Sequence, residues 1–165
     1  MNQEDAKELI SGAITGTHAQ HWADLGCGAG TFTKALASLL PGGSSIIAID
    51  QQPQHFKEKN IHFHQANMIT DALPLSRLDG ILLANAFHYV PDKVALIRKL
   101  EAFFTDSPRF VFVEYDTLHA NKWVPYPIDF ASLQKLFAPL GYQSAKLATY
   151  PSSFGGMMYA AIVER

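Results

Sequence analysis

The sequence has 165 residues, which is enough for one domain with a substantial hydrophobic core. A formal net charge of −2 gives no reason to expect binding to the phosphate backbone of nucleic acids, and no apolar run is long enough to cross a membrane. The single cysteine, Cys27, excludes an internal disulfide and is typical of a reducing compartment, which favours a cytoplasmic location.

The N-terminal segment contains one predicted helix. Between about Asp5 and Ile14, apolar residues recur at helical spacing, namely Leu9, Ile10, Ala13 and Ile14. We expect this short segment, about residues 1–18, to precede the first strand of a single domain that spans residues 1–165.

A glycine-rich stretch follows, with the sequence WADLGCGAGTFT at residues 22–33. It predicts the end of a buried strand, a turn and the start of a helix that runs toward Leu40. Glycines permit backbone angles closed to other residues and let a ligand lie against bare backbone. The first turn of the helix presents unpaired N–H groups to such a ligand. The dinucleotide-binding fingerprint has its third glycine one position later, where this chain has Thr31.

Asp24 stands at the strand end, two residues before Gly26. A carboxylate there would repel a pyrophosphate but would suit a ligand with an amino group or another positive charge. A turn that binds nothing is the alternative, against which Asp24 argues because a carboxylate at a strand end needs a partner. Cys27 is better interpreted as a small residue that fills the turn than as a nucleophile.

Residues 24–30, D-L-G-C-G-A-G, resemble the first motif of class I S-adenosylmethionine (SAM)-dependent methyltransferases of the small-molecule, UbiE-like type. In that family D-L-G-C-G-x-G is a common form, and every fixed position matches. The resemblance implies a SAM-binding site that includes Asp24, Gly26, Cys27, Gly28 and Gly30.

The run Ser45–Asp50 is apolar and ends in an acid, which predicts a central parallel strand buried on both faces. Asp50 lies about 20 residues beyond Gly30, where nucleotide-binding folds place the acid that holds ribose hydroxyls. Two carboxylate oxygens match two vicinal hydroxyls, so we favour this role over a solvated acid. The adjoining Gln51 is expected in the same site.

The alternating run Ile61–Gln65 predicts a short edge strand. His62 and His64 would share one face, but no third metal ligand is evident, so an exposed face is expected and no metal is indicated. Residues 66–75 then resemble the third motif of the family, with Asn67 in place of an aspartate that accepts a hydrogen bond from the adenine amino group. An amide oxygen can accept the same bond, and the resemblance therefore places Asn67 and the adjoining Met68 in the cofactor site. A turn residue is the alternative for Asn67.

Residues 78–85 predict the next buried strand, and the stretch AFHYVPD that follows resembles the L-H-H-V-x-D stretch of small-molecule methyltransferases. The resemblance implies that Asn85 contacts the cofactor and that His88 lines the methyl-transfer pocket. Packing against the next helix is the alternative for His88. We expect Pro91 in the first turn of that helix, with an apolar stripe formed by Leu96, Leu100, Phe103 and Phe104.

The strand Arg109–Asp116 ends in polar residues. Because ligands lie beyond the carboxyl ends of strands in open α/β sheets, four polar side chains should meet at one edge, namely Asp24, Asp50, Asn85 and Glu114. A general base for methyl transfer would have to lie nearby. The candidates are His88 and Tyr115, followed by Asp116 and His119.

The loop Asn121–Pro127 has two prolines and two aromatic residues, and is either a connector fixed to the surface by Trp123 or a wall of the substrate site. A helix marked by Leu133, Leu136, Phe137 and Leu140 should end at Gly141. Two closing strands, Tyr142–Thr149 and Met157–Glu164, should form a final hairpin.

These elements predict a three-layer α/β sandwich with a seven-stranded, mainly parallel sheet and one antiparallel strand. The resemblance implies transfer of a methyl group from SAM to a small-molecule acceptor, which leaves S-adenosylhomocysteine. A non-catalytic SAM-binding module is the first alternative. A nicotinamide-dependent oxidoreductase is a weaker alternative, because the glycine spacing and Asp24 oppose it. The acceptor, the atom methylated and the oligomeric state stay open.

Overall fold

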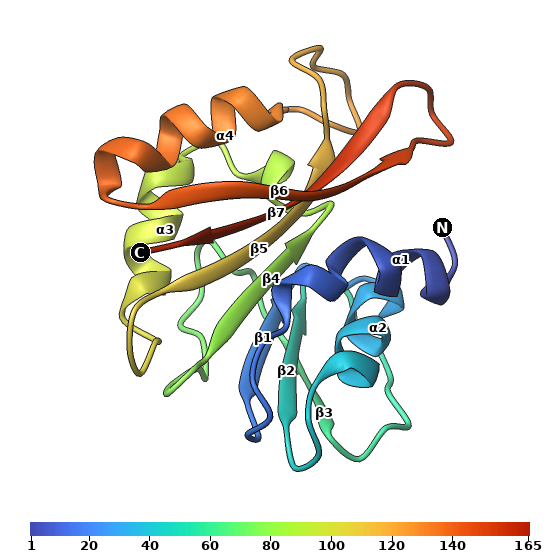
Figure 1. Ribbon diagram of the computed structural model, residues 1–165, viewed down its shortest axis with the longest axis vertical. Coiled ribbons are helices and arrows are strands. Elements are labelled where there is room, and N and C mark those ends of the chain that lie inside the picture. The colour runs from blue at the N-terminus through green and yellow to red at the C-terminus, as the bar shows by residue number, and fades with distance from the viewer.

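A computed structural model describes residues 1–165. Its strands are β1 His21–Leu25, β2 Ser45–Asp50, β3 Ile61–Gln65, β4 Gly80–Ala84, β5 Arg109–Tyr115, β6 Gln143–Pro151 and β7 Met157–Glu164. They form one sheet in the order β3-β2-β1-β4-β5-β7-β6 (Figure 1). All neighbouring pairs are parallel except those of β7, which runs antiparallel to both β5 and β6. The predicted seven-stranded sheet with one antiparallel strand is therefore confirmed.

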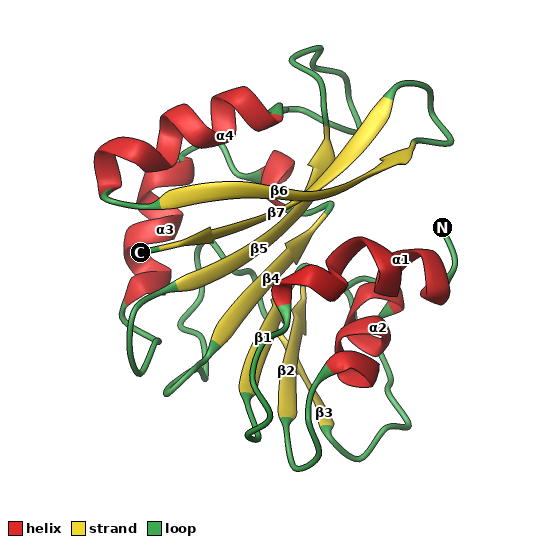
Figure 2. Cartoon of the chain, in the orientation of Figure 1, coloured by secondary structure: helices red, strands yellow, loops and turns green.

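Four α-helices cover the sheet, namely α1 Gln3–Ile10, α2 Thr31–Leu39, α3 Lys93–Glu101 and α4 Phe130–Phe137. Three short 3₁₀ helices accompany them: η1 Ser11–Ala13, η2 Phe87–Tyr89 and η3 Ala138–Leu140. Figure 2 shows α1 and α2 on one side of the sheet and α3 and α4 on the other. The core is accordingly divided into two clusters, one containing Leu9 and Leu36 and the other containing Leu100 and Phe137. This division confirms the three-layer sandwich.

The strands at the centre of the sheet explain why both faces must be covered. β4 and β5 are almost continuously apolar, and nearly all of their residues are buried. A strand with apolar side chains on both faces is stable only between two layers of other residues. The edge strand β3 instead exposes His62 and His64, as its alternating sequence predicts.

The helix after β4 differs from the prediction at both ends. Asp92 is its N-cap and accepts a hydrogen bond from the backbone of Ala95 at 3.0 Å, so Pro91 lies just before the helix and not in its first turn. The helix ends at Glu101, and Phe103 and Phe104 follow it in a turn that packs against the core. Helical spacing continued past the true end because an apolar turn can bury its side chains equally well.

Two of the crossovers between parallel strands contain no helix. Residues 51–60 join β2 to β3, and residues 66–79 join β3 to β4, both in irregular conformation. The first of these loops carries Phe56, which packs near Phe63 of β3 with 6.4 Å between ring centroids. Both loops leave the carboxyl ends of their strands, and this is the edge at which the polar residues gather.

Candidate active site

The glycine turn between β1 and α2 has the left-handed backbone that the sequence predicted. Gly26, Gly28 and Gly30 have φ angles of +75°, +50° and +87°. A Cβ atom on Gly26 would lie 2.7 Å from Cβ of Ala86, and one on Gly30 would overlap the ring of Phe56. A Cβ atom on Gly28 would meet nothing within 4 Å. The outer two glycines are therefore required by packing, whereas the backbone of Gly28 borders open space that a ligand can use.

Asp50 lies at the end of β2 and holds this turn in place. Its Oδ2 accepts a hydrogen bond from the backbone N–H of Gly28 at 2.8 Å, and its Oδ1 accepts one from Gln52 at 2.9 Å. A carboxylate has about four lone-pair sites, so the half-buried group can still accept bonds from a ligand. Gln51, beside it, is exposed, and its backbone oxygen accepts a bond from the side chain of Gln65.

Asp24 is only 1% exposed at the end of β1. Its Oδ2 accepts a hydrogen bond from the hydroxyl of Thr33 at 2.6 Å, whereas its Oδ1 is buried without a partner. The pKa of this carboxyl is raised to about 7 in total: burial is the largest cause, the hydrogen bond from Thr33 lowers the pKa, and the charge of Asp50 raises it. A buried acceptor of this kind favours a positively charged or hydrogen-donating ligand group.

Cys27, in the same turn, is also buried. Burial raises the pKa of its thiol far above the ordinary value, with the charges of Asp24 and Asp50 acting in the same direction. The thiolate is the reactive form of cysteine, so the raised pKa favours a side chain that fills space over a nucleophile. That matches the interpretation from the sequence.

Asn67 occupies a tight turn after β3. Its side-chain oxygen accepts hydrogen bonds from the backbone of Ile69 at 2.8 Å and of Thr70 at 3.3 Å. Both lone pairs are thus used within the turn, which favours the turn interpretation over a bond to adenine. Met68 packs partly buried against the core, and its backbone oxygen accepts a bond from Lys99.

Asn85 lies close to the glycine turn and also lines a cavity described below. It follows β4 with a φ of +53°, a conformation that asparagine tolerates better than most residues. Its side-chain Oδ1 is buried and has no hydrogen-bond partner. The next residue, Ala86, packs directly on Gly26, so the end of β4 touches the glycine turn.

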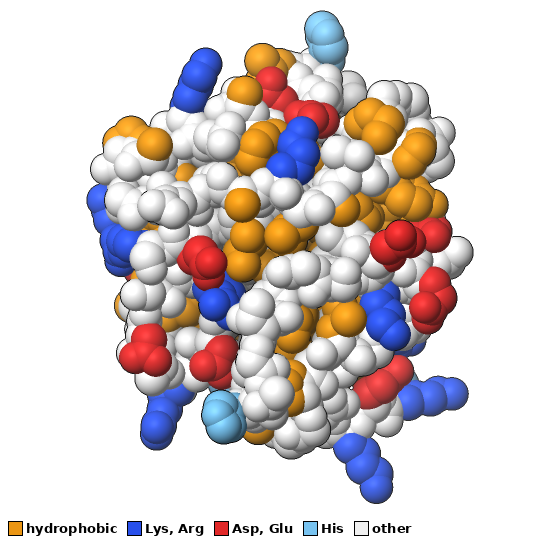
Figure 3. Space-filling model, in the orientation of Figure 1, with side chains coloured by type: hydrophobic (Ala, Val, Ile, Leu, Met, Phe, Trp, Pro, Cys, Tyr) orange, Lys and Arg blue, Asp and Glu red, His pale blue; other side chains and the backbone are white.

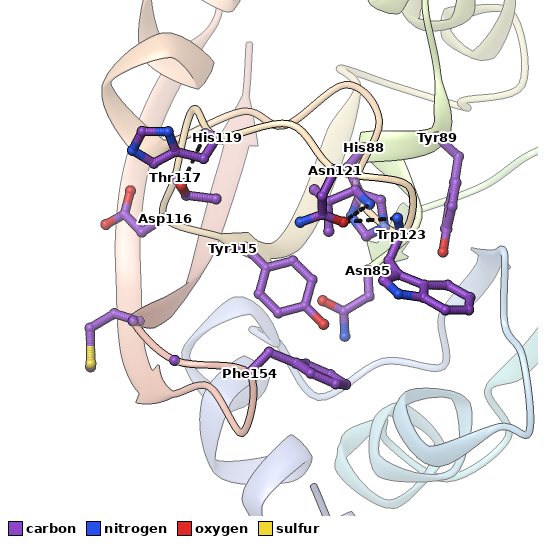
Figure 4. Close-up of a pocket in the computed structure, with 14 residues that line it drawn as sticks. Asn85, His88, Tyr89, Tyr115, Asp116, Thr117, His119, Asn121, Trp123 and Phe154 are labelled. Atoms are coloured by element: carbon purple, nitrogen blue, oxygen red, sulfur yellow. Dashed lines mark hydrogen bonds between the residues drawn. The ribbon is translucent and has the colours of Figure 1, made fainter.

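Asn85 also lines a cavity of about 820 Å³. Its walls come from residues 85–89, which follow β4 and include η2, from residues 115–124 at and beyond the end of β5, and from residues 154–157 at the tip of the β6–β7 hairpin. Figure 4 shows the rings of Tyr115, Trp123 and Phe154 around the side-chain amide of Asn85. No residue of the glycine turn lines this cavity. The lining residues are Asn85, His88, Tyr89, Tyr115, Asp116, Thr117, His119, Asn121, Trp123, Val124, Phe154, Gly155, Gly156 and Met157.

His88 lines the cavity from η2 and is hydrogen-bonded to the buried carboxylate of Glu114. Its Nδ1 lies 2.6 Å from Oε2 of Glu114, and the two residues are 3% and 1% exposed. The other carboxylate oxygen of Glu114 accepts bonds from the backbone N–H groups of Phe87, at 2.8 Å, and His88, at 3.2 Å. The sequence predicted Glu114 at this edge but not its pairing with His88. The two residues are 26 positions apart, and no local sequence pattern indicates that they meet.

The remaining base candidates differ in environment. Tyr115 lines the cavity 5.8 Å from the ring of His88, and burial with the nearby Glu114 charge raises its pKa. Both oxygens of Asp116 are already bonded, one to the backbone of Phe130 and the other to Lys146. His119 is exposed at the rim. Among the candidates with a ring, only His88 has a charged partner that fixes the ring.

The loop that contains Trp123 is held by Asn121, whose side-chain oxygen accepts bonds from the backbone of Trp123 at 2.8 Å and of Val124 at 3.0 Å. Trp123 is 68% exposed and lines the cavity, so the structure favours a wall of the site over a connector fixed by that ring. Sequence reasoning missed Phe56 and Phe154. Both lie in loops, where no periodic pattern predicts the direction in which a side chain points.

The described residues contain no group of three or more histidine, cysteine, aspartate or glutamate side chains that could hold a metal ion. No helix combines the length and the apolarity needed to span a membrane.

Comparisons with known proteins identify the fold and the family. Magnesium protoporphyrin IX methyltransferase from Synechocystis PCC 6803, solved with SAH bound, is 13% identical, with 99% of this chain and 82% of that chain covered and a TM-score of 0.72. A SAM-dependent methyltransferase from Mesorhizobium loti is 15% identical, with 99% and 100% covered and a TM-score of 0.71. YcgJ from Bacillus subtilis is 15% identical, with 98% and 97% covered and a TM-score of 0.67. At these identities the likeness shows a shared fold.

No curated protein matches the sequence. A family model described as a methyltransferase domain matches residues 18–146, from before β1 into β6. The matched range includes the glycine turn, Asp50, Asn85 and the His88–Glu114 pair. The chain therefore belongs to this methyltransferase domain family.

Proposed function

We propose that residues 1–165 act as one SAM-binding domain that transfers a methyl group from SAM to a small-molecule acceptor. One observation carries this proposal. Two buried acceptor atoms lack partners, namely Oδ1 of Asp24, at the start of the glycine turn, and Oδ1 of Asn85, whose neighbour Ala86 packs on Gly26; the turn itself is open at Gly28. Buried polar atoms are almost always paired, so two unpaired ones beside an open backbone favour a ligand that supplies donors.

The residues present fit SAM. Asp24 would hold its ammonium group, because the carboxylate is buried and lacks a partner on one oxygen. Asp50 would hold the ribose hydroxyls with the lone pairs that Gly28 and Gln52 leave free. The structural neighbour from Synechocystis was solved both with SAH and with SAM bound, which supports this choice of cofactor. We do not assign adenine to Asn67.

SAM, when bound, supplies a methyl group on a positively charged sulfur. An acceptor atom attacks the carbon of that methyl group, in line with the carbon–sulfur bond. The protein contributes position: a cofactor at the glycine turn and an acceptor in the cavity would meet at Asn85, the residue that lies next to both. Holding two reactants in the reacting geometry is a large part of the catalysis of such a displacement. The cavity of about 820 Å³ lies in the range of small-molecule sites, about 300–1,000 Å³.

Isothermal titration calorimetry tests the cofactor assignment. SAM and S-adenosylhomocysteine should bind at one site, whereas NAD should give no saturable heat because Asp24 opposes a pyrophosphate. Absence of binding by both sulfur compounds, or equal binding of NAD, would contradict the proposal. A screen of small-molecule acceptors for S-adenosylhomocysteine formation then separates an enzyme from a non-catalytic binding module.

A further inference from the structure

We propose that the cavity takes an uncharged, planar aromatic acceptor with an ionisable hydroxyl, and that His88, held by Glu114, removes the proton of that hydroxyl. The inference rests on the proposed function, since the cavity becomes an acceptor site only if a methyl donor occupies the glycine turn. It adds the chemical class of the acceptor, the atom methylated and a named base.

Aromatic rings form most of the wall of the cavity. Tyr89, Tyr115, Trp123 and Phe154 all line it, and Val124 and Met157 add apolar surface. Trp123 and Phe154 are 68% and 86% exposed, although large aromatic side chains are usually buried. Figure 3 shows apolar side chains gathered at the tip of the β6–β7 hairpin, the segment that carries Phe154 and Met157. Exposed rings that border one cavity favour a flat, apolar ligand that can stack against them.

The charges around the cavity favour an uncharged ligand. No lysine or arginine lines it. Of the acids nearby, Asp116 is paired with Lys146 at 3.1 Å, and Glu114 is bonded to His88. A carboxylate or phosphate acceptor would find no cation in the wall, and an ammonium acceptor would find no free anion. A charged compound that enters such a site loses its hydration without gaining a partner.

Nearby lysines do not alter this balance. The ammonium group of Lys122 lies over the ring of Trp123, 4.7 Å from its centroid, and Lys122 is not among the lining residues. Lys93 donates to the backbone oxygens of Val90 and Tyr126, which occupies its ammonium outside the cavity.

The geometry of the His88–Glu114 pair leaves one ring nitrogen free to accept a proton. With Glu114 as a carboxylate acceptor, the proton of neutral His88 is on Nδ1, and Nε2 carries the lone pair. Nε2 has no hydrogen-bond partner, and it is not one of the fully buried atoms that lack a partner. The small exposed fraction of His88 therefore includes this nitrogen, and the surface that it meets is the cavity.

Buried bonds fix the direction of this nitrogen. Glu114 accepts three hydrogen bonds from η2, of which two come from backbone N–H groups. The ring of His88 also packs between those of Tyr89, at 4.3 Å, and Tyr115, at 5.8 Å between centroids. A carboxylate that orients a histidine in this way selects the tautomer and stabilises the imidazolium that forms. Glu114 is a positioning residue in this scheme.

The step is a proton transfer coupled to a displacement. The hydroxyl of the acceptor gives its proton to Nε2 of His88, and its oxygen forms a bond to the methyl carbon. The carbon–sulfur bond breaks, and its electron pair stays on sulfur, which changes from a sulfonium to a neutral thioether. The products are an aryl methyl ether, S-adenosylhomocysteine and a proton on His88 that is released to solvent.

Two coumarins of nearly equal shape test the base. At pH 7, 7-hydroxy-4-methylcoumarin keeps its hydroxyl proton, whereas the 6,8-difluoro derivative is already ionised. His88→Ala should lower kcat for the first compound by about 10²–10⁴-fold, because a positioned base contributes that much. It should lower kcat for the second by less than about tenfold, since no proton remains to be removed. Glu114→Gln should shift the ratio between the two compounds in the same direction.

Controls separate this result from damage to the fold or the cofactor site. SAM affinity of each variant is measured by calorimetry and should stay within about threefold of the wild type. His62→Ala, a matched histidine variant on the exposed edge strand β3, should leave both rates unchanged. Equal losses for the two coumarins in His88→Ala would overturn the base role. If the wild-type protein did not bind SAM, that result would instead refute the proposed function.

The acceptor class has its own test. Trp123→Ala should raise KM for 7-hydroxy-4-methylcoumarin about tenfold with little change in kcat, and Trp123→Phe should restore it. The 3-carboxylate of 7-hydroxycoumarin, which is anionic, should have a KM at least about tenfold above that of the uncharged compound. If wild-type protein with SAM bound does not methylate 7-hydroxy-4-methylcoumarin, or prefers the 3-carboxylate of 7-hydroxycoumarin, the acceptor class is wrong.

Discussion

The two halves of the site are built in opposite ways. The glycine turn is one unbroken stretch, residues 24–30, and its glycines are fixed by close contacts with Ala86 and the ring of Phe56 and by a hydrogen bond to Asp50. The cavity draws its walls from three separate segments, and its most prominent side chains are exposed rings. A turn of fixed backbone suits a cofactor of constant shape, whereas exposed loop side chains can vary without cost to the core. Substitutions should therefore affect stability in the turn and acceptor affinity in the cavity.

The largest expected effects come from two glycines of the same turn. Gly30→Ala should lower the free energy of unfolding by about 3–5 kcal/mol, because the new Cβ overlaps the ring of Phe56 and the left-handed φ is strained. Gly28→Asn should cost little stability, since asparagine tolerates this φ and the space beside Gly28 is open. It should nevertheless reduce SAM affinity about 100-fold or more, because the side chain fills the place of the ligand.

Urea unfolding and calorimetry with SAM separate the two glycines. If Gly28→Asn bound SAM with the affinity of the wild type, the turn would not be the cradle of the cofactor. If Gly30→Ala were as stable as the wild type, the contact with Phe56 would not constrain the turn.

Asp24 should make the stability of the ligand-free protein depend on pH. Its folded pKa of about 7 lies above the ordinary 3.8, so its contribution is fully present below about pH 4 and is lost as the pH rises through 7. The full difference corresponds to about 4 kcal/mol. Asp24→Asn should remove this loss, and thermal unfolding between pH 5 and 8 measures it.

SAM should reverse that trend, because its ammonium favours the ionised form of Asp24. Its affinity should rise between pH 6 and 8, with release of a proton that calorimetry in buffers of different ionisation enthalpy detects. A pH-independent affinity with no proton release would separate Asp24 from the ammonium site.

Substitution of Asp50 should reduce SAM affinity less than Gly28→Asn does, and should also reduce the stability of the protein measurably. Asp50→Ala removes bonds to a charged acceptor worth roughly 1.5–3 kcal/mol each, which corresponds to about tenfold or more in SAM affinity. It also frees the N–H groups of Gly28 and Gln52, so a moderate loss of stability should accompany it. Asp50→Asn, which keeps one acceptor oxygen, should lie between the two proteins. An unchanged dissociation constant in Asp50→Ala would remove this residue from the site.

Cys27 should have the smallest effect. Cys27→Ala should change stability by less than about 1.5 kcal/mol and leave SAM affinity unchanged, because the thiol only fills space. Since burial raises its thiol pKa, native protein at pH 8 should react with iodoacetamide far more slowly than urea-unfolded protein. Equal alkylation rates in the two states would show that the thiol is accessible.

Short-range features of the site were readable in the sequence. The glycine spacing and Asp24 predicted the turn and the nature of its ligand, and the run Ser45–Asp50 predicted a buried strand that ends at Asp50. These features depend on neighbours in the chain: a left-handed turn needs glycine, and a strand buried on both faces needs consecutive apolar residues. Asn67 shows the limit of the same reasoning, because only its bonds to Ile69 and Thr70 favoured a turn over an adenine contact.

Long-range features depended on the packing of the whole chain. Glu114 and His88 are 26 positions apart and meet because β4 and β5 are adjacent and their carboxyl ends lie at one edge of the sheet. Phe154 reaches the cavity because β7 runs antiparallel beside β5 and brings the β6–β7 hairpin to that edge. Local patterns carry backbone preference and burial, but the distance between two side chains is set by strand order and register. The turn proposed to hold the cofactor was therefore visible in the sequence, and the pair of residues proposed to act on the acceptor became visible only in the folded chain.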